Sequence, residues 1–171
     1  NNVFFFFFGL GINYNVNDVY SVFAGLHRGF APPRIKDAIT NGGKALQLDA
    51  ELSWNYEAGV RANVSSFLSF EITGYMLDFS NQIIPVSESS GGSGTGLING
   101  GETLHLGIES GVKLAVDKII NTAYGITLIA NLTFSKSKYD ADRFITAGDE
   151  KINIRNNKLP YAPEIYFSGL L

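Results

Sequence analysis

Apolar and polar side chains alternate along most of this chain. In residues 53–65, which read SWNYEAGVRANVS, every second residue from Trp54 is apolar or aromatic, and the residues between them are polar or glycine. Because a β-strand sends successive side chains to opposite faces, the pattern predicts a strand with one apolar and one polar face. Six further segments repeat it, with apolar positions within residues 4–14, 20–26, 68–76, 104–116, 124–134 and 165–171. Helical periodicity fits these segments poorly, so we expect long antiparallel strands.

The connections between these segments alternate in length. Residues 15–18, 65–67 and 117–122 form short connections, whereas residues 32–52, 80–101 and 138–162 form long ones rich in Gly, Ser, Asn and Asp. One of the long connections contains the only candidate for a short helical turn, at residues 33–39. Since every second connection is long, all the long ones fall at one end of an antiparallel sheet. This is the layout of an outer-membrane barrel, with tight periplasmic turns and long extracellular loops.

Strand length distinguishes a membrane barrel from a soluble sheet. About 12 residues at roughly 3.3 Å each span about 40 Å, and a tilt near 45° reduces this to about 28 Å, close to the bilayer core. A large soluble antiparallel sheet packed on a second layer shows the same alternation, but soluble strands are usually shorter. Aromatic residues near the expected strand ends also favour a membrane interface; they are Tyr14, Tyr20, Trp54, Tyr56, Tyr124 and Phe134.

Composition agrees with an all-β protein that has one apolar surface. Charged residues make up 17% of the 171 residues, below the roughly 25% that is usual in soluble domains, while aromatics reach 13%. The net charge of −3 argues against nucleic-acid binding, which needs a basic patch. The absence of cysteine excludes disulfides and thiolate metal sites. No run of about 18 apolar residues predicts a transmembrane helix, and the missing initiator Met indicates a mature product or an internal fragment.

Five stretches of the chain resemble a known family when taken in order. They read NDVYSVFAGLHRGFAPPRI, ELSWNYEAGVR, YMLDFSNQI, GLINGGETLHLGIESG and LPYAPE. They resemble TonB-dependent outer-membrane receptors, in particular the ferric-citrate-type receptors. The matching positions are Gly29, Phe30, Pro32, Pro33, Tyr56, Glu57, Gly59, Arg61, Gly107 and Glu109, with residues 81–83 and 160–163.

The resemblance implies a transport function. Such receptors are barrels of about 22 strands that a plug domain fills. They import a ferric chelate through the outer membrane of a Gram-negative bacterium, with energy from a TonB-type inner-membrane complex. Residues 1–171 match part of the barrel and carry no plug domain. About seven strands alone would leave two sheet edges unpaired in lipid, where backbone groups find no partners, so we expect the remaining strands elsewhere in the parent chain.

Charged residues on the polar faces are candidates for the barrel interior. Glu57, Arg61, Glu71, Glu109 and Lys113 would face a plug domain or a wet lumen, and ordinary solvation of the interior is the alternative. Glu57 and Arg61 lie four residues apart on one strand face, about 13 Å, so each must pair with another strand.

Ligand contacts are expected near the long connections. An anionic ferric chelate needs cations at the outer mouth, and Arg28, Arg34 and Lys36 are the candidates there. The alternatives are ordinary loop charge or contact with lipopolysaccharide phosphates, since outer-membrane lipid and lipopolysaccharide are the expected surroundings. His27 and His105 are the only histidines and make no case for a metal site, and no protein cofactor is indicated.

Three functions therefore compete. The first is import of a ferric chelate by a TonB-dependent receptor. The second is import of another cargo, such as vitamin B12, a glycan or a peptide, by the same kind of barrel. The third is a structural or adhesive outer-membrane barrel without transport. No arrangement of Ser, His and Asp residues indicates an enzyme.

Overall fold

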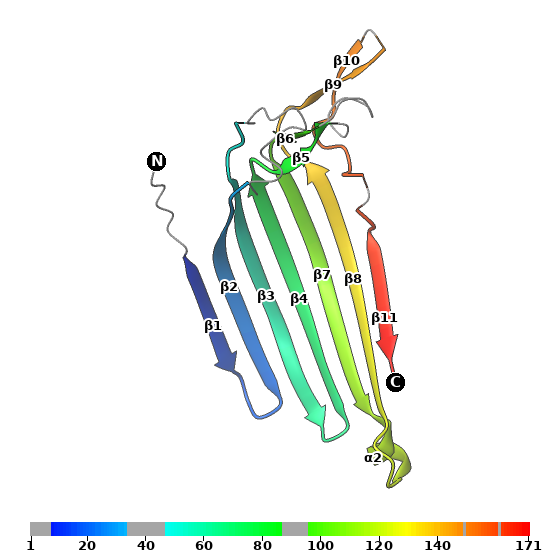
Figure 1. The fold of residues 1–171 in the computed structure, drawn as a ribbon. Helices are drawn as coiled ribbons and strands as arrows, with labels where there is room; N and C mark the ends of the chain where they lie inside the picture. The colour runs from blue at the N-terminus through cyan, green and yellow to red at the C-terminus, as the bar shows by residue number, and fades with distance from the viewer. Residues whose placement is uncertain (1–7, 34–46, 87–95, 149, 161) are drawn as a thin grey trace.

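The computed structural model describes residues 8–33, 47–86, 96–148, 150–160 and 162–171. Within these residues a seven-stranded antiparallel sheet dominates the fold, in the order β1-β2-β3-β4-β7-β8-β11 (Figure 1). Its strands are β1 Gly9–Asn15, β2 Tyr20–Ala31, β3 Glu51–Ser65, β4 Leu68–Ser80, β7 Thr103–Ala115, β8 Thr127–Tyr139 and β11 Ile165–Leu170. The predicted all-β fold with long antiparallel strands is confirmed. Residues 4–7 of the first predicted segment, and residues 34–39 of the predicted helical turn, lie outside the described part.

The connections alternate between the two ends of the sheet as predicted. Figure 1 shows the short ones at the lower end and the long ones at the upper end. Two of the long connections contain small hairpins that the sequence patterns did not predict. One pairs β5 Ile83–Pro85 with β6 Leu97–Asn99, and the other pairs β9 Phe144–Ala147 with β10 Glu150–Asn153.

The short connections are fixed by local hydrogen bonds. Between β1 and β2, the Asn17 side-chain oxygen accepts the backbone N–H groups of Val19 and Tyr20 at 2.9 and 2.8 Å. Between β7 and β8 lies α2 Val116–Ile120, which ends at Asn121 in the left-handed conformation with φ of 52°. Lys118 Nζ donates to the backbone oxygen of Ser66 at 2.6 Å, and so ties α2 to the turn between β3 and β4.

The register of the sheet sorts side chains into two faces. One row of directly paired residues runs Ile12, Ala24, Ala58, Gly74, Ile108, Phe134 and Ile165. A row three residues further along β3 contains Arg61 and runs Asn15, Ser21, Arg61, Glu71, Gly111, Asn131 and Ser168. Since side chains alternate along each strand, we call the surface that contains the first row the apolar face and the surface that contains the second row the polar face.

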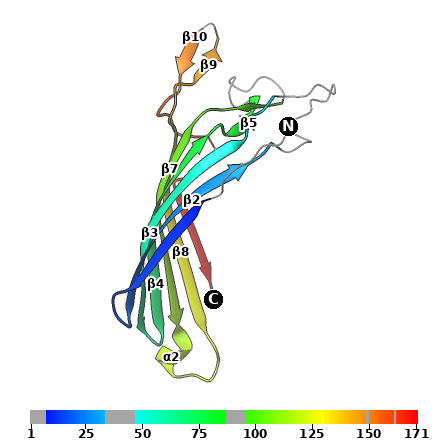
Figure 2. The same ribbon diagram turned by 90° about the vertical axis from the view of Figure 1, so that its left-hand side faces the viewer.

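The sheet is a single curved layer (Figure 2). In the described part of the chain no second layer covers the apolar face, so large side chains on it are exposed: Ile72 by 48%, Ile108 by 55% and Phe167 by 73%. A soluble sheet would bury such a face against another layer. Five of the strands have 12 to 15 residues, enough for a tilted strand to cross a bilayer.

Aromatic residues lie near both ends of the sheet. Tyr14 and Tyr20 lie at the short-connection end, and Trp54 lies near the long-connection end of β3, as predicted. The predictions for Tyr56 and Phe134 were wrong, because each is the sixth residue from the long-connection end of its strand and therefore lies mid-strand. The interfacial pattern rests on the other residues.

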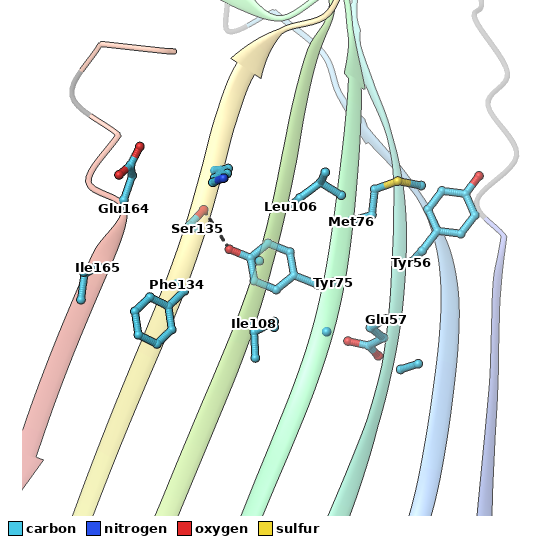
Figure 3. A pocket seen from close by; sticks show the side chains of 14 residues that line it. Tyr56, Glu57, Tyr75, Met76, Leu106, Ile108, Phe134, Ser135, Glu164 and Ile165 are labelled. Carbon is cyan, nitrogen blue, oxygen red and sulfur yellow. Dashed lines mark hydrogen bonds between the residues drawn. The ribbon is translucent and has the colours of Figure 1, made fainter. Parts of the chain in front are cut away.

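Two aromatic rings on the polar face cover glycines of a neighbouring strand. Phe23 of β2 lies against Gly59 of β3, and Tyr75 of β4 lies against Gly107 of β7. Tyr75 reaches across β7 and donates from its hydroxyl to Ser135 Oγ at 3.1 Å (Figure 3). Because Gly59 and Gly107 have no side chain, the rings can lie flat along the sheet over them. Such aromatic packing stabilises a strand at its glycines.

Replacing Gly59 by alanine should destabilise the barrel. A Cβ at this position would lie 2.5 Å from the Phe23 ring and 2.6 Å from the backbone oxygen of Ile72, so the strand or the ring must move. We expect Gly59→Ala to lower the free energy of unfolding by about 1–3 kcal/mol. The measurement is denaturant unfolding of the full-length protein in detergent, followed by circular dichroism.

Gly74→Ala is the matched control. The nearest atom to a Cβ there is the Ala58 backbone oxygen at 3.9 Å, an ordinary contact, and Gly74 also lies mid-strand. Equal stability of the two variants would contradict the packing described for Gly59.

Candidate functional site

The five predicted interior residues all lie on the polar face. Glu57 and Arg61 come from β3, Glu71 from β4, and Glu109 and Lys113 from β7. The ladder places Arg61, Glu71 and Glu109 in register with polar or small residues of both neighbouring strands. Alternation along three adjacent strands therefore gathers these charges on one surface.

Arg61 and Glu71 form an ion pair across β3 and β4. They are directly opposed in the ladder, and Arg61 Nε donates to Glu71 Oε2. Thr73 Oγ1 donates to the other carboxylate oxygen of Glu71 at 3.3 Å, and the Arg61 guanidinium lies 4.0 Å from the centre of the Phe23 ring. The carboxylate is thus held by two donors and the guanidinium by a carboxylate and a ring face. The prediction that Arg61 pairs with another strand is confirmed.

Glu57 pairs with a histidine of the other neighbouring strand. Its Oε1 atom lies 3.7 Å from His27 Nε2, which makes an ion pair only when the imidazole is protonated. Gly25 stands directly opposite Glu57, and a Cβ there would lie 2.7 Å from the carboxylate. The glycine therefore gives the carboxylate its room to reach toward His27.

Glu109 and Lys113 border a hollow in the polar face. The hollow has a volume of about 540 Å³ and is also lined by Arg61, Glu71 and Asn131. Within the described residues Glu109 and Lys113 have no ion-pair partner. The hollow therefore presents both carboxylate and cationic side chains to any group that covers the polar face.

The predicted ligand-contact residues are only partly within the described part of the chain. Arg28 lies on the apolar face near the end of β2, where its guanidinium stacks on the Trp54 ring at 4.8 Å. Arg34 and Lys36 lie outside the described residues. Arg28 is half-buried, and its stacking on Trp54 is typical of an arginine at a membrane rim.

Arg143 is a loop cation that the sequence patterns missed. It follows β8, stacks on the Tyr139 ring at 4.9 Å, and donates from Nη1 to the Gly100 backbone oxygen at 3.1 Å. Its Nη2 atom is buried and has no hydrogen-bond partner in the described part. Tyr139 belongs to the polar face, so this unsatisfied donor lies above the polar side of the sheet. The sequence around Arg143 does not predict these contacts, because they form where the long connection after β8 meets the one before β7.

A neighbouring loop carboxylate is held in its charged form. Asn153 Nδ2 donates to Asp142 Oδ1 at 3.0 Å, and Arg155 Nη1 lies 3.5 Å from the same atom. The Asn153 hydrogen bond and then the Arg155 charge lower the pKa of Asp142 below its ordinary value. Arg155 is thus paired, in contrast to Arg143.

The two histidines do not form a metal site. The ring nitrogens of His105 lie 2.7 Å from Ser137 Oγ and 3.2 Å from Thr103 Oγ1, and the ring packs edge-on against Phe79. In the part of the chain described, no group of three or more His, Cys, Asp or Glu residues could hold a metal ion. The described residues also include no helix long and apolar enough to cross a membrane.

Comparison with known proteins identifies a family. The family model described as "TonB dependent receptor-like, beta-barrel" matches residues 1–171, the whole chain. A search of curated proteins found no match. The family match agrees with the two-faced sheet, the alternating connections and the charged polar face.

The coupling between Arg61 and Glu71 can be measured directly. Their side chains are 49% and 43% exposed, so we expect a double-mutant cycle with Arg61→Gln and Glu71→Gln to give about 0.2–1 kcal/mol. The measurement is denaturant unfolding of the full-length protein and the three variants in detergent. A coupling above about 2 kcal/mol would contradict the solvation seen here, because only a buried pair reaches that size.

Proposed function

The chain belongs to the TonB-dependent receptor β-barrel family, and from this premise we propose that it forms wall strands of a transporter that imports a ferric chelate. Barrels of this family lie in the outer membrane of Gram-negative bacteria, work with a plug domain and the TonB complex, and are transporters rather than enzymes. The family membership is shown by the comparison, whereas the ferric cargo is our proposal. A ferric siderophore or ferric citrate would be that cargo.

The observation that carries the proposal is the two-faced sheet. Its apolar face is exposed and long enough to cross a bilayer, while its polar face holds ion pairs such as Arg61 with Glu71. A barrel with this orientation has its charges inside, where a plug domain or water satisfies them. We propose that Glu109 and Lys113, which border the polar hollow, contact the plug domain.

The cations near the long connections support an anionic cargo. We propose that Arg34 and Lys36 meet the chelate at the outer mouth, with Arg143 on the polar side of the sheet. The unsatisfied Nη2 of Arg143 is a donor without a partner, and a carboxylate or catecholate oxygen of a chelate would satisfy it.

The mechanism follows from these positions. The long connections capture the chelate and the charged polar face lines its path. Movement of the plug domain, driven by the TonB complex from the inner membrane, opens that path. The described strands supply the fixed wall, because their ladder pairs every strand with its neighbours.

A deletion strain tests the cargo. We expect loss of the parent gene to abolish uptake of radioactive iron from one ferric chelate under iron limitation, and to leave vitamin B12 uptake unchanged. Reintroducing the gene is the control. Normal uptake of every ferric chelate would contradict the proposal, and a defect in B12, glycan or peptide uptake instead would favour the same kind of barrel with another cargo. No uptake defect at all would favour a structural or adhesive barrel.

Arg143→Gln tests the proposed chelate contact. Removing a charge-assisted hydrogen bond worth about 1.5–3 kcal/mol should raise the concentration for half-maximal uptake at least about tenfold. Arg155→Gln is the matched control, since Arg155 is a loop arginine already paired with Asp142. Equal effects of both variants, at equal amounts of heat-modifiable receptor in the outer membrane, would contradict a specific role for Arg143.

A further inference from the structure

The Asn99–Gly100 pair at the end of β6 joins the three long connections. Asn99 Oδ1 accepts the backbone N–H of Asp49 at 2.8 Å, and Asn99 Nδ2 donates to the backbone oxygens of Asp49 and Asn81 at 2.9 and 2.8 Å. The backbone oxygen of Gly100 accepts the hydrogen bond from Arg143 Nη1. Asp49 precedes β3, Asn81 follows β4 and Arg143 follows β8, so every long connection contributes a contact. We call the pair and these partners the junction.

The junction requires a glycine after Asn99. Gly100 is buried, and a Cβ at this position would clash with the Ile84 side chain and lie 3.2 Å from Arg143 Nη1. Only glycine therefore lets these two side chains approach the backbone. Since the amide of Asn99 supplies both a donor and an acceptor to Asp49, the junction places an asparagine directly before a glycine.

An asparagine that precedes a glycine is especially prone to deamidation, because no side chain shields the next backbone nitrogen. The Gly100 nitrogen loses its proton and forms a bond to Asn99 Cγ, the bond from Cγ to Nδ2 breaks, and ammonia leaves with a proton. Water then opens the cyclic imide to aspartic acid or to isoaspartic acid, in which the backbone runs through the side chain. Water enters, ammonia leaves, and nothing is oxidised or reduced.

The closed junction opposes this reaction. The Gly100 N–H donates to the backbone oxygen of Gln82 at 2.6 Å, which retains the proton that must leave. The Asn99 side chain cannot turn without giving up the hydrogen bonds of its amide. Closing the imide ring also rotates the backbone at Asn99, and pairing with Ile83 in the β5–β6 hairpin resists that rotation. Deamidation therefore proceeds from a locally opened junction, at a rate set by how often the junction opens.

We propose that Asn99–Gly100 is a deamidation site, which the closed junction keeps unreactive and which opening exposes. The product prevents the junction from closing again. A carboxylate at position 99 has no donor for the backbone oxygens of Asp49 and Asn81 and places negative charge beside them. Arg143 binds the next residue along the chain, so the third connection is released with the other two. Deamidation thus separates the long connections irreversibly.

Peptide mass spectrometry of the full-length receptor in detergent measures the reaction. The receptor is incubated in mildly alkaline buffer, folded or unfolded in urea, and conversion of Asn99 is followed with time. We expect conversion at least about tenfold slower in the folded receptor, because opening breaks the charge-assisted hydrogen bond from Arg143. In the unfolded receptor, Asn99 and Asn41, which also precedes a glycine, should react at similar rates. Equal rates at Asn99 in the folded and unfolded receptor would overturn the proposal.

Arg143→Gln tests whether the junction sets the rate. It removes one bond of the junction and leaves the Asn–Gly pair intact, so conversion of Asn99 in the folded receptor should accelerate about fivefold or more. Arg155→Gln is the matched control, because Arg155 lies in the same connection but pairs with Asp142. Both variants are compared as folded, heat-modifiable receptor. Unchanged conversion in Arg143→Gln, or equal acceleration by the two variants, would overturn the proposal.

Asn99→Asp tests the consequence, because it carries the carboxylate of the product. Hydrogen exchange measured by mass spectrometry should become faster near Asp49, Gln82 and Arg143, that is, in all three long connections. Asn153→Asp is the matched control, since within the described residues the Asn153 side chain binds only its own connection. Faster exchange confined to the connection that contains Asn99 would overturn the proposed release. Iron uptake is not a readout here, so the cargo proposal can fail without affecting this result.

Discussion

The antiparallel hydrogen-bond ladder of the main sheet determines where every side chain of the described strands lies. Because side chains alternate with a period of two, a slip of one residue in any pairing would move charges such as Glu71 to the apolar face. The ladder keeps one register across most of its length, with a shift only near Asn63 and Ser65 at a strand end. The chemical contrast between the two faces is therefore a direct result of backbone pairing.

The two faces of the sheet need different surroundings: the apolar face needs lipid, and the polar face needs partners for its charges. On the apolar face, exposed side chains such as Ile108 are stable only against lipid, so the sheet depends on a membrane for its free energy. On the polar face, Arg61 pairs with Glu71 across strands and Glu57 lies 3.7 Å from His27, and a plug domain or water solvates what remains. Aromatic rings laid over Gly59 and Gly107 fill the places between them. The family identity and the physical surface thus lead to the same orientation.

Sequence alternation was enough to predict the strands, their two faces and the ends at which the connections lie, because these depend on local periodicity. The partners of Glu57 and Arg61 depend on how neighbouring strands are aligned, and the sequence of one strand does not determine that alignment. The sequence could therefore predict that these residues pair across strands, but not with which residues. The helix α2 was missed because it is fixed by Asn121 and a contact from Lys118 to a distant turn. Arg143 was missed for the same reason, since its contact with Gly100 joins two long connections.

The order of the strands has a consequence for how the sheet assembles. Each strand of the main sheet pairs only with the strand before it and the strand after it along the chain, apart from the small hairpins. The pairs β1 with β2, β3 with β4 and β7 with β8 are joined by short connections, so closing them sacrifices little chain entropy. Pairing β2 with β3 or β4 with β7 requires closing a long connection first. Two-strand units are therefore the natural folding steps, and a nascent receptor can enter the membrane one hairpin at a time.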